Sequence, residues 1–178
     1  AVNHMLAHLY ASHLAYDIHY PYLGLLVSGG HSIICKVLGF DSIEVLGTTI
    51  DDAVGEAFDK VAKFYNFGYP GGLAIDKLAK NGNPKAAHFP MPSIDKQNRS
   101  NTQDSKFARD NLHYFDVSYS GLKTAAINQI DQFWNPAFER TPENIAAAFQ
   151  ETAIKILLKR VFRAVEDTGI RTIVAGGG

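Results

Sequence analysis

The sequence has few of the residues that indicate cross-linked, membrane-spanning or secreted proteins. Its 178 residues contain a single cysteine, Cys35, so no internal disulfide can form, and one free thiol fits a reducing compartment. No apolar run approaches the roughly 18 to 20 residues that a membrane span needs, and the first residues do not resemble a signal peptide. We therefore expect a cytoplasmic protein without a membrane segment.

An excess of charge of one sign is also missing. The 17 Lys and Arg residues nearly balance the 18 Asp and Glu residues, which gives a formal net charge of −1. This balance excludes a global basic signature of nucleic-acid binding, but it leaves a local basic face open. The sequence is 46% hydrophobic and 20% charged, which is typical of an ordinary globular protein rather than a disordered one.

Both ends of the sequence look like cut positions. It begins with Ala1-Val2-Asn3, without an initiator Met and inside a helical pattern. It stops at Ala175–Gly178, directly after the strand-like Thr172–Val174. We expect a fragment of a longer protein, cut at both ends.

The hydrophobic spacing predicts an α/β fold. Residues 3–16 have helical spacing, and the apolar runs Tyr22–Val27 and Ile33–Leu38 flank Ser28–His31, which predicts a β-hairpin. A third strand is expected at Ile43–Leu46. The remaining expected elements are a helix opening at Gly47–Asp51 and broken by Gly68–Gly72, a short helix Leu73–Lys80, an exposed polar insertion 93–113, a helix from Lys123 to about Phe133, a long helix from Thr141–Pro142 to Gly169, and a last strand Ile170–Val174.

Two histidines, His4 and His8, are the first candidates for a functional site. Four positions apart on a helix, both imidazoles lie on one face, close enough to hold one metal ion. Two imidazoles leave the coordination sphere incomplete, so a carboxylate from elsewhere would have to complete it. Such a mixed nitrogen and oxygen ligand set suits iron as well as zinc. The zinc-protease motif has Glu after its first His, whereas Met5 stands here, so this is not that motif. A histidine pair at this spacing also occurs by chance.

Three glycine-containing or polar turns each allow two interpretations. Ser28–His31 is a common hairpin turn, or a loop whose bare N–H groups approach a phosphate. Tyr69–Gly72 ends a helix, or lets the backbone approach a flat ligand. Ser118–Lys123 is a turn into a helix, or a polar helix N-terminus that meets an anion or a partner.

The acidic stretch from Asp51 to Asp59 also has two interpretations. Carboxylates at the start of a helix favour its dipole, which explains most of these residues without a ligand. Asp59 differs because it flanks Phe58, near the core-facing stripe, and could point into a cleft and accept hydrogen bonds from ribose hydroxyls.

The order of these motifs resembles that of the TsaD family, the bacterial tRNA threonylcarbamoyladenosine transferases once called glycoproteases. The resemblance runs almost the full chain, and its long acidic block is the most specific part. The segments that carry it are Asn3–His8, Leu25–His31, Gly47–Lys60, Tyr69–Gly72, Ser118–Thr124 and Ala175–Gly177.

The resemblance implies an actin-like ATPase fold of the Hsp70 and sugar-kinase superfamily. Residues 1–20 would be the metal-binding helix between two lobes, and residues 21–178 would form the second lobe, with the polar insertion 93–113. It also implies that the first lobe and the segment after the terminal glycines are missing, so residues 1–178 alone should have little or no activity.

The activity implied by the resemblance is transfer of a threonylcarbamoyl group from threonylcarbamoyl-adenylate to N6 of adenosine 37, in tRNAs that read codons beginning with A. It implies one Fe2+ ion per chain, or Zn2+, bound by His4 and His8, with tRNA, a TsaB-type paralogue and a TsaE-type ATPase as partners. The metal helix and the glycine hairpin would converge on one cleft. The substrate-binding residues implied by position are Val27, Ser28, Gly29, Gly30, His31, Asp59, Gly72 and Asp76, and Gly176 and Gly177 would begin the last nucleotide loop.

The chain departs from the family pattern between its two histidines, and its polar loop 93–113 is longer than expected. Leu6-Ala7 stands where the family usually has Glu-Gly, which removes a carboxylate that could orient a ligand histidine. Leu26 replaces a ligand Tyr of archaeal and eukaryotic relatives, as expected of bacterial members. A catalytically silent scaffold of the same fold stays an alternative, although both histidines are present. A metalloprotease is disfavoured by Met5, and a sugar or acetate kinase would give the histidine pair no role.

Overall fold

The computed structural model describes residues 4–92 and 113–177, which form a mixed α/β arrangement and confirm the expected class. Two compact units share these residues. Unit 1 comprises residues 4–50, 113–117 and 158–177, and unit 2 comprises residues 51–92 and 118–157. The predicted boundary after residue 20 concerns the lobes of the whole protein and stays a prediction.

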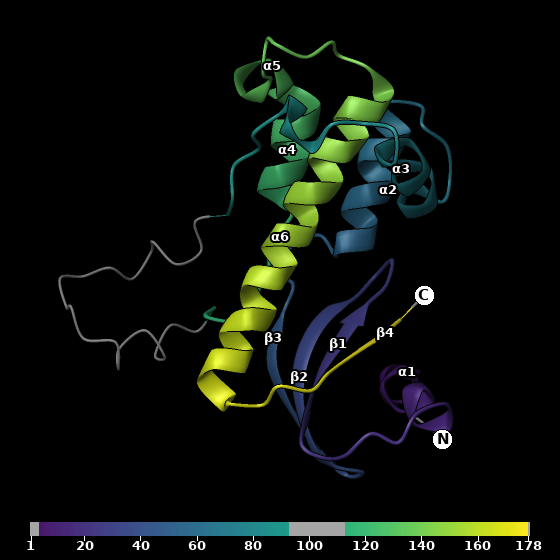
Figure 1. Ribbon diagram of the computed structural model, residues 1–178, viewed down its shortest axis with the longest axis vertical. Coiled ribbons are helices and arrows are strands. Elements are labelled where there is room, and N and C mark those ends of the chain that lie inside the picture. Colours follow the sequence, from purple (N-terminus) through teal and green to yellow (C-terminus); the bar gives the residue numbers. More distant parts are fainter. Residues whose placement is uncertain (1–3, 93–112, 178) are drawn as a thin grey trace, which may run out of the picture. The chain divides into compact units, whose positions relative to one another are not determined.

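Unit 1 is built on a four-stranded sheet with strand order β3-β2-β1-β4 (Figure 1). Strands β1 and β2 form an antiparallel hairpin, which confirms the predicted turn at Ser28–His31, and β3 pairs antiparallel with β2. Strand β4 runs parallel to β1, so the carboxyl ends of these two strands meet at one edge. The strands are β1 (Tyr22–Val27), β2 (Ser32–Gly39), β3 (Ser42–Thr48) and β4 (Ile173–Gly176).

Alternate side chains of β1 face two different helices, as the two-residue period of a strand requires. Tyr22 and Leu26 pack in one core with Leu9 of helix α1 (His4–Ala11). Leu23, on the other face, packs with Val161 of the long helix α6 (Pro142–Thr168). The sheet therefore lies between α1 and the last part of α6, and its two cores fix α1 against β1 and β4.

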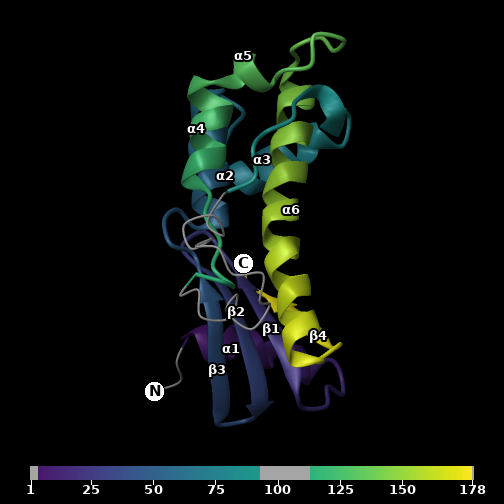
Figure 2. The same ribbon diagram turned by 90° about the vertical axis from the view of Figure 1, so that its left-hand side faces the viewer.

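Unit 2 is helical. Helices α3 and α4 both pack beside α2 (Figure 2), and the α2 residue Phe58 meets Phe149 of α6 edge to face at 5.1 Å between ring centroids. Small buried residues such as Ala57 and Ala62 let these helices approach closely. Besides the first part of α6, the helices are α2 (Val54–Phe64), α3 (Gly71–Ala79), α4 (Ser120–Asn128), α5 (Ile130–Phe133) and a 3-10 turn Pro84–Ala86.

The long helix begins and ends as its sequence predicts. Thr141 Oγ1 accepts the N–H of Asn144 at 3.2 Å, which is the expected N-cap. Gly169 has φ +72°, and its N–H donates to the Val165 carbonyl at 2.9 Å, which closes a left-handed cap.

Several predicted boundaries differ from the structure because distant pairing overrides local pattern. The predicted helix is present as α2, but its predicted start at Gly47–Asp51 is wrong: β3 extends through Thr48, and α2 begins at Val54. The segment stays extended because Thr48 and Ile50 exchange backbone hydrogen bonds of 3.0 Å with Val117, about which the local sequence carries no information.

The other differences are smaller. The helix predicted over residues 3–16 ends at Ala11 and continues as a 3-10 turn, Ser12–Leu14. The helix expected to reach Phe133 is interrupted at Gln129. The last strand runs from Ile173 through Gly176 because it pairs with β1. The predicted insertion 93–113 lies outside the described residues, apart from its last residue. Within the described ranges, no helix is long and apolar enough to cross a membrane.

Candidate functional site

The two histidines of α1 point their ring nitrogens at one another. The Nε2 atoms of His4 and His8 are 3.0 Å apart, and the rings meet edge to face with centroids separated by 4.6 Å. This spacing fits two imidazoles that ligate one ion. In residues 4–92 and 113–177, however, no group of three or more His, Cys, Asp or Glu side chains could hold a metal. Within the described residues, the pair could therefore supply only two ligands to a metal ion.

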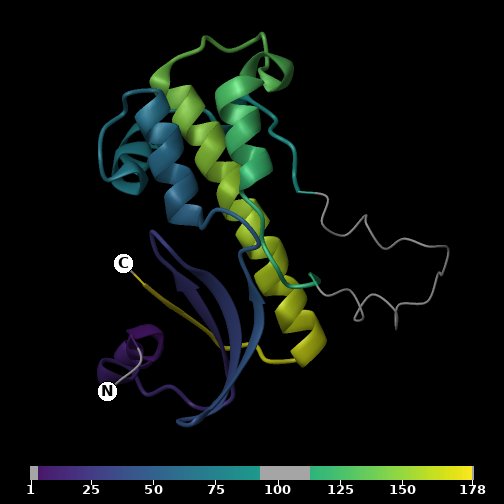
Figure 3. The same cartoon turned by 180° about the vertical axis from the view of Figure 1, so that it is seen from behind.

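The end of β4 lies directly against the histidine helix (Figure 3). A Cβ built on Gly176 would come within 2.7 Å of the His8 carbonyl oxygen, so glycine lets the strand pass this close. Gly176 also pairs with Leu26 of β1, and a Cβ on Gly177 would overlap the Val27 carbonyl oxygen. The histidine helix, the start of the hairpin turn and the terminal glycines thus meet at the carboxyl ends of two parallel strands. Open α/β sheets bind ligands at such an edge.

The hairpin turn is held by Ser28 and His31. The Ser28 N–H donates to the His31 carbonyl at 2.8 Å, and the His31 N–H donates to Ser28 Oγ at 3.1 Å. Between them, Gly29 and Gly30 are exposed, and a Cβ on either would meet no atom within 4 Å. Neither has a positive φ. Since the fold does not demand glycine at these two positions, their bare backbone is suited to close approach by an anion.

The three predicted substrate residues of unit 2 lie on α2 and α3. Asp59 Oδ1 accepts the N–H of Gly71 at 2.7 Å, which joins α2 to the first residue of α3. The next residue, Gly72, has open space where a Cβ would be. Asp76 lies one turn further along α3, on the same face as Gly72. A hydrogen bond from Gln150 and the ammonium of Lys80 lower the pKa of Asp76, so its carboxylate already has partners.

A surface pocket of about 560 Å³ opens beside Asp59, within the size range of small-molecule sites. It lies entirely in unit 2, between the second half of α2 and the loop that follows. The lining residues are Asp59, Lys60, Ala62, Lys63, Asn66, Gly68 and Tyr69.

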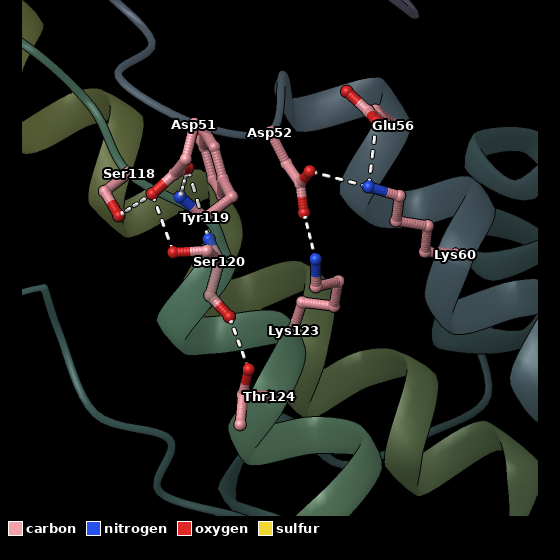
Figure 4. A network of polar contacts seen from close by, with 9 residues as sticks. All are labelled: Asp51, Asp52, Glu56, Lys60, Ser118, Tyr119, Ser120, Lys123 and Thr124. Carbon is pink, nitrogen blue, oxygen red and sulfur yellow. Dashed lines mark hydrogen bonds and ion pairs between the residues drawn. The ribbon is translucent and has the colours of Figure 1, made fainter.

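The polar N-terminus of α4 meets an anion of the chain itself, the carboxylate of Asp51 (Figure 4). This carboxylate accepts the hydroxyls of Ser118 at 2.5 Å and Ser120 at 2.7 Å, and the backbone N–H groups of Tyr119 at 2.8 Å and Ser120 at 3.2 Å. Burial opposes the charge on Asp51, but these four donors outweigh it and lower its pKa. The segment Ser118–Lys123 is thus a turn into α4, as one interpretation predicted, and the donors at the start of this helix are occupied by a carboxylate of the chain itself.

The neighbouring Asp52 ties α2 to α4. Its two carboxylate oxygens accept from Lys123 Nζ at 2.5 Å and Lys60 Nζ at 2.6 Å, and Lys60 also reaches Glu56 at 2.8 Å (Figure 4). Burial opposes the charge here as well, yet the two ammonium groups lower the pKa of Asp52. From the sequence alone, these acidic residues are explained by the dipole of the helix that follows them. Their partners lie about 70 residues later, in the segment Ser118–Lys123. The only sign of this pairing in the sequence is the complementary charge of Asp52 and Lys123.

Comparison with known proteins agrees with this geometry. The family model described as TsaD, tRNA N6-adenosine threonylcarbamoyltransferase, matches residues 1–178. A Treponema denticola protein of that name is 72% identical over all 178 residues, and its Treponema pallidum counterpart is 54% identical. A Borrelia duttonii protein of the same name is 46% identical over 177 residues. The chain covers 48%, 47% and 48% of these relatives, so it spans about half the length of the curated relatives that it matches. Because the family model matches all 178 residues of the chain, this chain belongs to the TsaD family.

Proposed function

We propose that the protein containing this chain transfers the threonylcarbamoyl group of threonylcarbamoyl-adenylate to N6 of adenosine 37, in tRNAs that read codons beginning with A. The relatives matched along the full chain are named tRNA N6-adenosine threonylcarbamoyltransferase, a name that supports transfer of the group to N6 of a tRNA adenosine. The structural observation that carries the proposal is the meeting of His8, Val27 and Gly176 at one edge of the sheet. We also propose an actin-like ATPase fold for the whole protein, which the sheet order with its parallel β1–β4 pair supports.

The reaction needs stabilisation of a leaving phosphate. The N6 amine attacks the carbamoyl carbon, so a C–N bond forms, the C–O bond to the adenylate phosphate breaks, and the amine loses a proton as AMP leaves. The exposed N–H groups of Gly29 and Gly30 would hold this phosphate, and the Ser28 hydroxyl, which accepts from the His31 N–H, keeps its own proton to donate. Fixed donors directed at developing negative charge favour departure of AMP.

His4 and His8 would hold the metal ion, Fe2+ or Zn2+, as two neutral imidazole ligands. When bound, such an ion supplies Lewis-acid polarisation of a carbonyl oxygen. The 3.0 Å separation of the two Nε2 atoms supports shared ligation. Asp59, Gly72 and Asp76 would contact the ribose and base of the adenylate, and the exposed backbone at Gly72 leaves room for that approach.

The substrate and its chemistry define the partners. A tRNA must present adenosine 37 with its base turned out of the loop, because the amine is otherwise inaccessible. We propose a TsaB-type paralogue and a TsaE-type ATPase as protein partners, and the cytoplasm as the place of action, where the tRNA substrate is found. These proposals rest on membership of the family.

Transfer of labelled threonine and bicarbonate onto unmodified tRNA tests the function directly. The full-length protein, supplied with the partner proteins, should modify adenosine 37, and an inactive preparation with intact partners would favour the silent-scaffold alternative. Metal content should fall in His8→Ala and persist in His19→Ala, whose imidazole is exposed and faces Asp17 at 3.7 Å. Equal metal content in wild type and His8→Ala would remove His8 from the site.

A further inference from the structure

Unit 1 exposes large apolar side chains at the end of the sheet that lies away from the glycine turn. The strand register places the start of β1 beside the β2–β3 turn, whereas Ser28–His31 closes the opposite end (Figure 1). The six residues of β1 separate the two ends by about 17 Å. Substitutions at the β2–β3 end therefore leave the glycine turn itself untouched.

The exposed side chains come from two segments that are distant in the sequence. Leu14, in the 3-10 turn after α1, is 92% exposed, and Tyr16, just beyond it, is 72% exposed. Tyr20 is partly exposed immediately before β1, and Phe40, in the β2–β3 turn, is 69% exposed. Large apolar residues that gather at one place, rather than being scattered singly, indicate an interaction site.

Stacked rings join the two segments into one surface. The ring of Phe40 lies 5.0 Å from that of Tyr10 between centroids, and the His13 ring lies 5.9 Å from Tyr10 on the other side. The Tyr20 ring stacks on His13 at 5.4 Å. Two hydrogen-bond contacts fix this row, because the Tyr10 hydroxyl donates to the Phe40 carbonyl and the Tyr22 hydroxyl lies 3.1 Å from His13 Nε2. The rings are thus held in place before a partner arrives, which lowers the entropic cost of docking.

The charges around these rings are negative. Asp17 and Asp41 directly follow two of the exposed aromatic residues, and both carboxylates are exposed. Residues 1–35 contain no Lys or Arg, and the next residue, Lys36, binds Glu44 at 2.5 Å. RNA phosphates would be repelled here, so the charge favours a protein partner with basic side chains over the tRNA.

We infer that this end of unit 1 docks one of the protein partners of the transferase. The segment that fits it carries apolar side chains, which meet the rings, and Lys or Arg side chains, which meet the two carboxylates. The inference rests on the proposed function, in which two partner proteins assist the transfer. We call the docking site the acidic aromatic surface, and its residues are Leu14, Tyr16, Asp17, Tyr20, Phe40 and Asp41.

Variants of the full-length protein test the inference by calorimetry, with the TsaB-type paralogue and the TsaE-type ATPase added separately. Phe40→Glu places a charge among the rings, and Tyr16→Ala removes an exposed ring. Asp17→Lys combined with Asp41→Lys reverses the charge and keeps every ring. Phe64→Glu is the matched control, because Phe64 is a 54% exposed phenylalanine of α2 in the other unit. Hydrogen exchange of the β2–β3 turn is measured with and without each partner.

We expect Phe40→Glu and Tyr16→Ala to weaken one partner by about 10- to 100-fold, as loss of an aromatic anchor does, while Phe64→Glu stays within about threefold of wild type. The double charge reversal should weaken the same partner and reduce the dependence of its affinity on salt. The β2–β3 turn should gain protection only when that partner is added, and tRNA affinity should not fall in the charge-reversed protein.

Three results would overturn the inference. The first is binding of both partners that changes no more in these variants than in Phe64→Glu. The second is a fall of tRNA affinity in Tyr16→Ala while both partners bind normally, which would make this surface an RNA-binding one. The third is full protection of the β2–β3 turn without any partner, which would mean that another part of the protein, or a second copy, covers the surface.

The same measurements separate this inference from the proposed function. If the wild-type protein transfers no threonylcarbamoyl group but binds a partner in a manner that depends on Phe40 and Tyr16, the function fails and the docking surface stands. If transfer and partner binding proceed normally in Phe40→Glu and Tyr16→Ala, the function stands and the docking surface fails.

Discussion

Replacing Asp51 by alanine removes the acceptor of four hydrogen bonds at the start of α4. Two are backbone N–H groups, and loss of a helix cap of this kind costs about 1 kcal/mol. The Ser118 hydroxyl also loses its acceptor, and this residue is only 9% exposed, so water replaces the bond poorly, at a further cost of about 1 kcal/mol. The Ser120 hydroxyl is more exposed and can be hydrated. We expect Asp51→Ala to lower the free energy of unfolding of unit 2 by about 2 kcal/mol.

Urea unfolding followed by the fluorescence of Trp134 measures this loss. Trp134 is the single tryptophan of these 178 residues and lies in the same unit as Asp51. Asp51→Asn should cost about half as much, because the amide oxygen can still accept from the backbone while the hydroxyls rotate to accept from its NH2 group. Asp41→Ala, at an exposed position between β2 and β3, serves as the control and should change stability by less than about 0.5 kcal/mol.

The pKa of Asp51 gives the prediction a second, pH-dependent readout. The folded-state pKa lies below the ordinary value of 3.8, so in acid the unfolded chain binds more protons at this residue than the folded one. The contribution of Asp51 is therefore complete above that ordinary value and is lost as pH falls through the lower folded-state pKa. Asp51→Asn should flatten the acid slope of stability. A loss under about 0.5 kcal/mol in Asp51→Ala, or an unchanged acid slope in Asp51→Asn, would refute the assigned network.

Three further predictions concern backbone positions. Gly71→Ala should destabilise unit 2 by about 1–3 kcal/mol, because its Cβ would press on the Asp59 backbone, whereas Gly72→Ala should leave thermal stability unchanged and weaken AMP binding. Gly177→Ala should destabilise unit 1, because its φ is +132° and its Cβ would overlap a carbonyl, but Gly30→Ala should fold normally and reduce transfer. Asn66 has φ +56°, so Asn66→Gly should be tolerated, whereas Asn66→Val should lower the free energy of unfolding by about 1–2 kcal/mol. Urea unfolding with a parallel transfer assay checks each pair of variants.

Asn66 illustrates how much of a helix end is determined locally. The N–H of Phe67 donates to the Ala62 carbonyl at 2.9 Å and that of Asn66 to the Lys63 carbonyl at 3.3 Å, the paired bonds of a left-handed helix end. Such features depend on a few adjacent residues, so a sequence can predict them. For the same reason β1 was predicted with its observed bounds, and so were the cap and the end of α6.

The polar network of Figure 4 shows what local pattern cannot supply. Asp51 lies 67 residues before Ser118, and Asp52 lies 71 residues before Lys123. Each of these residues has a satisfactory interpretation at its own position, as a helix-dipole carboxylate or a solvated lysine. Their pairing follows from the packing of α4 beside α2, which is a property of the folded unit. The wrongly predicted helix start at Gly47–Asp51 has the same cause, because the strand-like segment there pairs with Val117, which is equally remote.

The glycines of the predicted site show why the structure is needed to separate folding from binding. Gly71 and Gly72 are adjacent and chemically identical, yet a Cβ on the first would strike α2 and a Cβ on the second would meet nothing within 4 Å. The same contrast holds between Gly177 and Gly30. Replacing a glycine that the fold requires lowers stability. A loss of activity in such a variant would therefore say little about ligand binding. Gly30 and Gly72 have no such structural demand, so a loss of transfer in folded Gly30→Ala or Gly72→Ala protein would point to close approach of a substrate at that backbone.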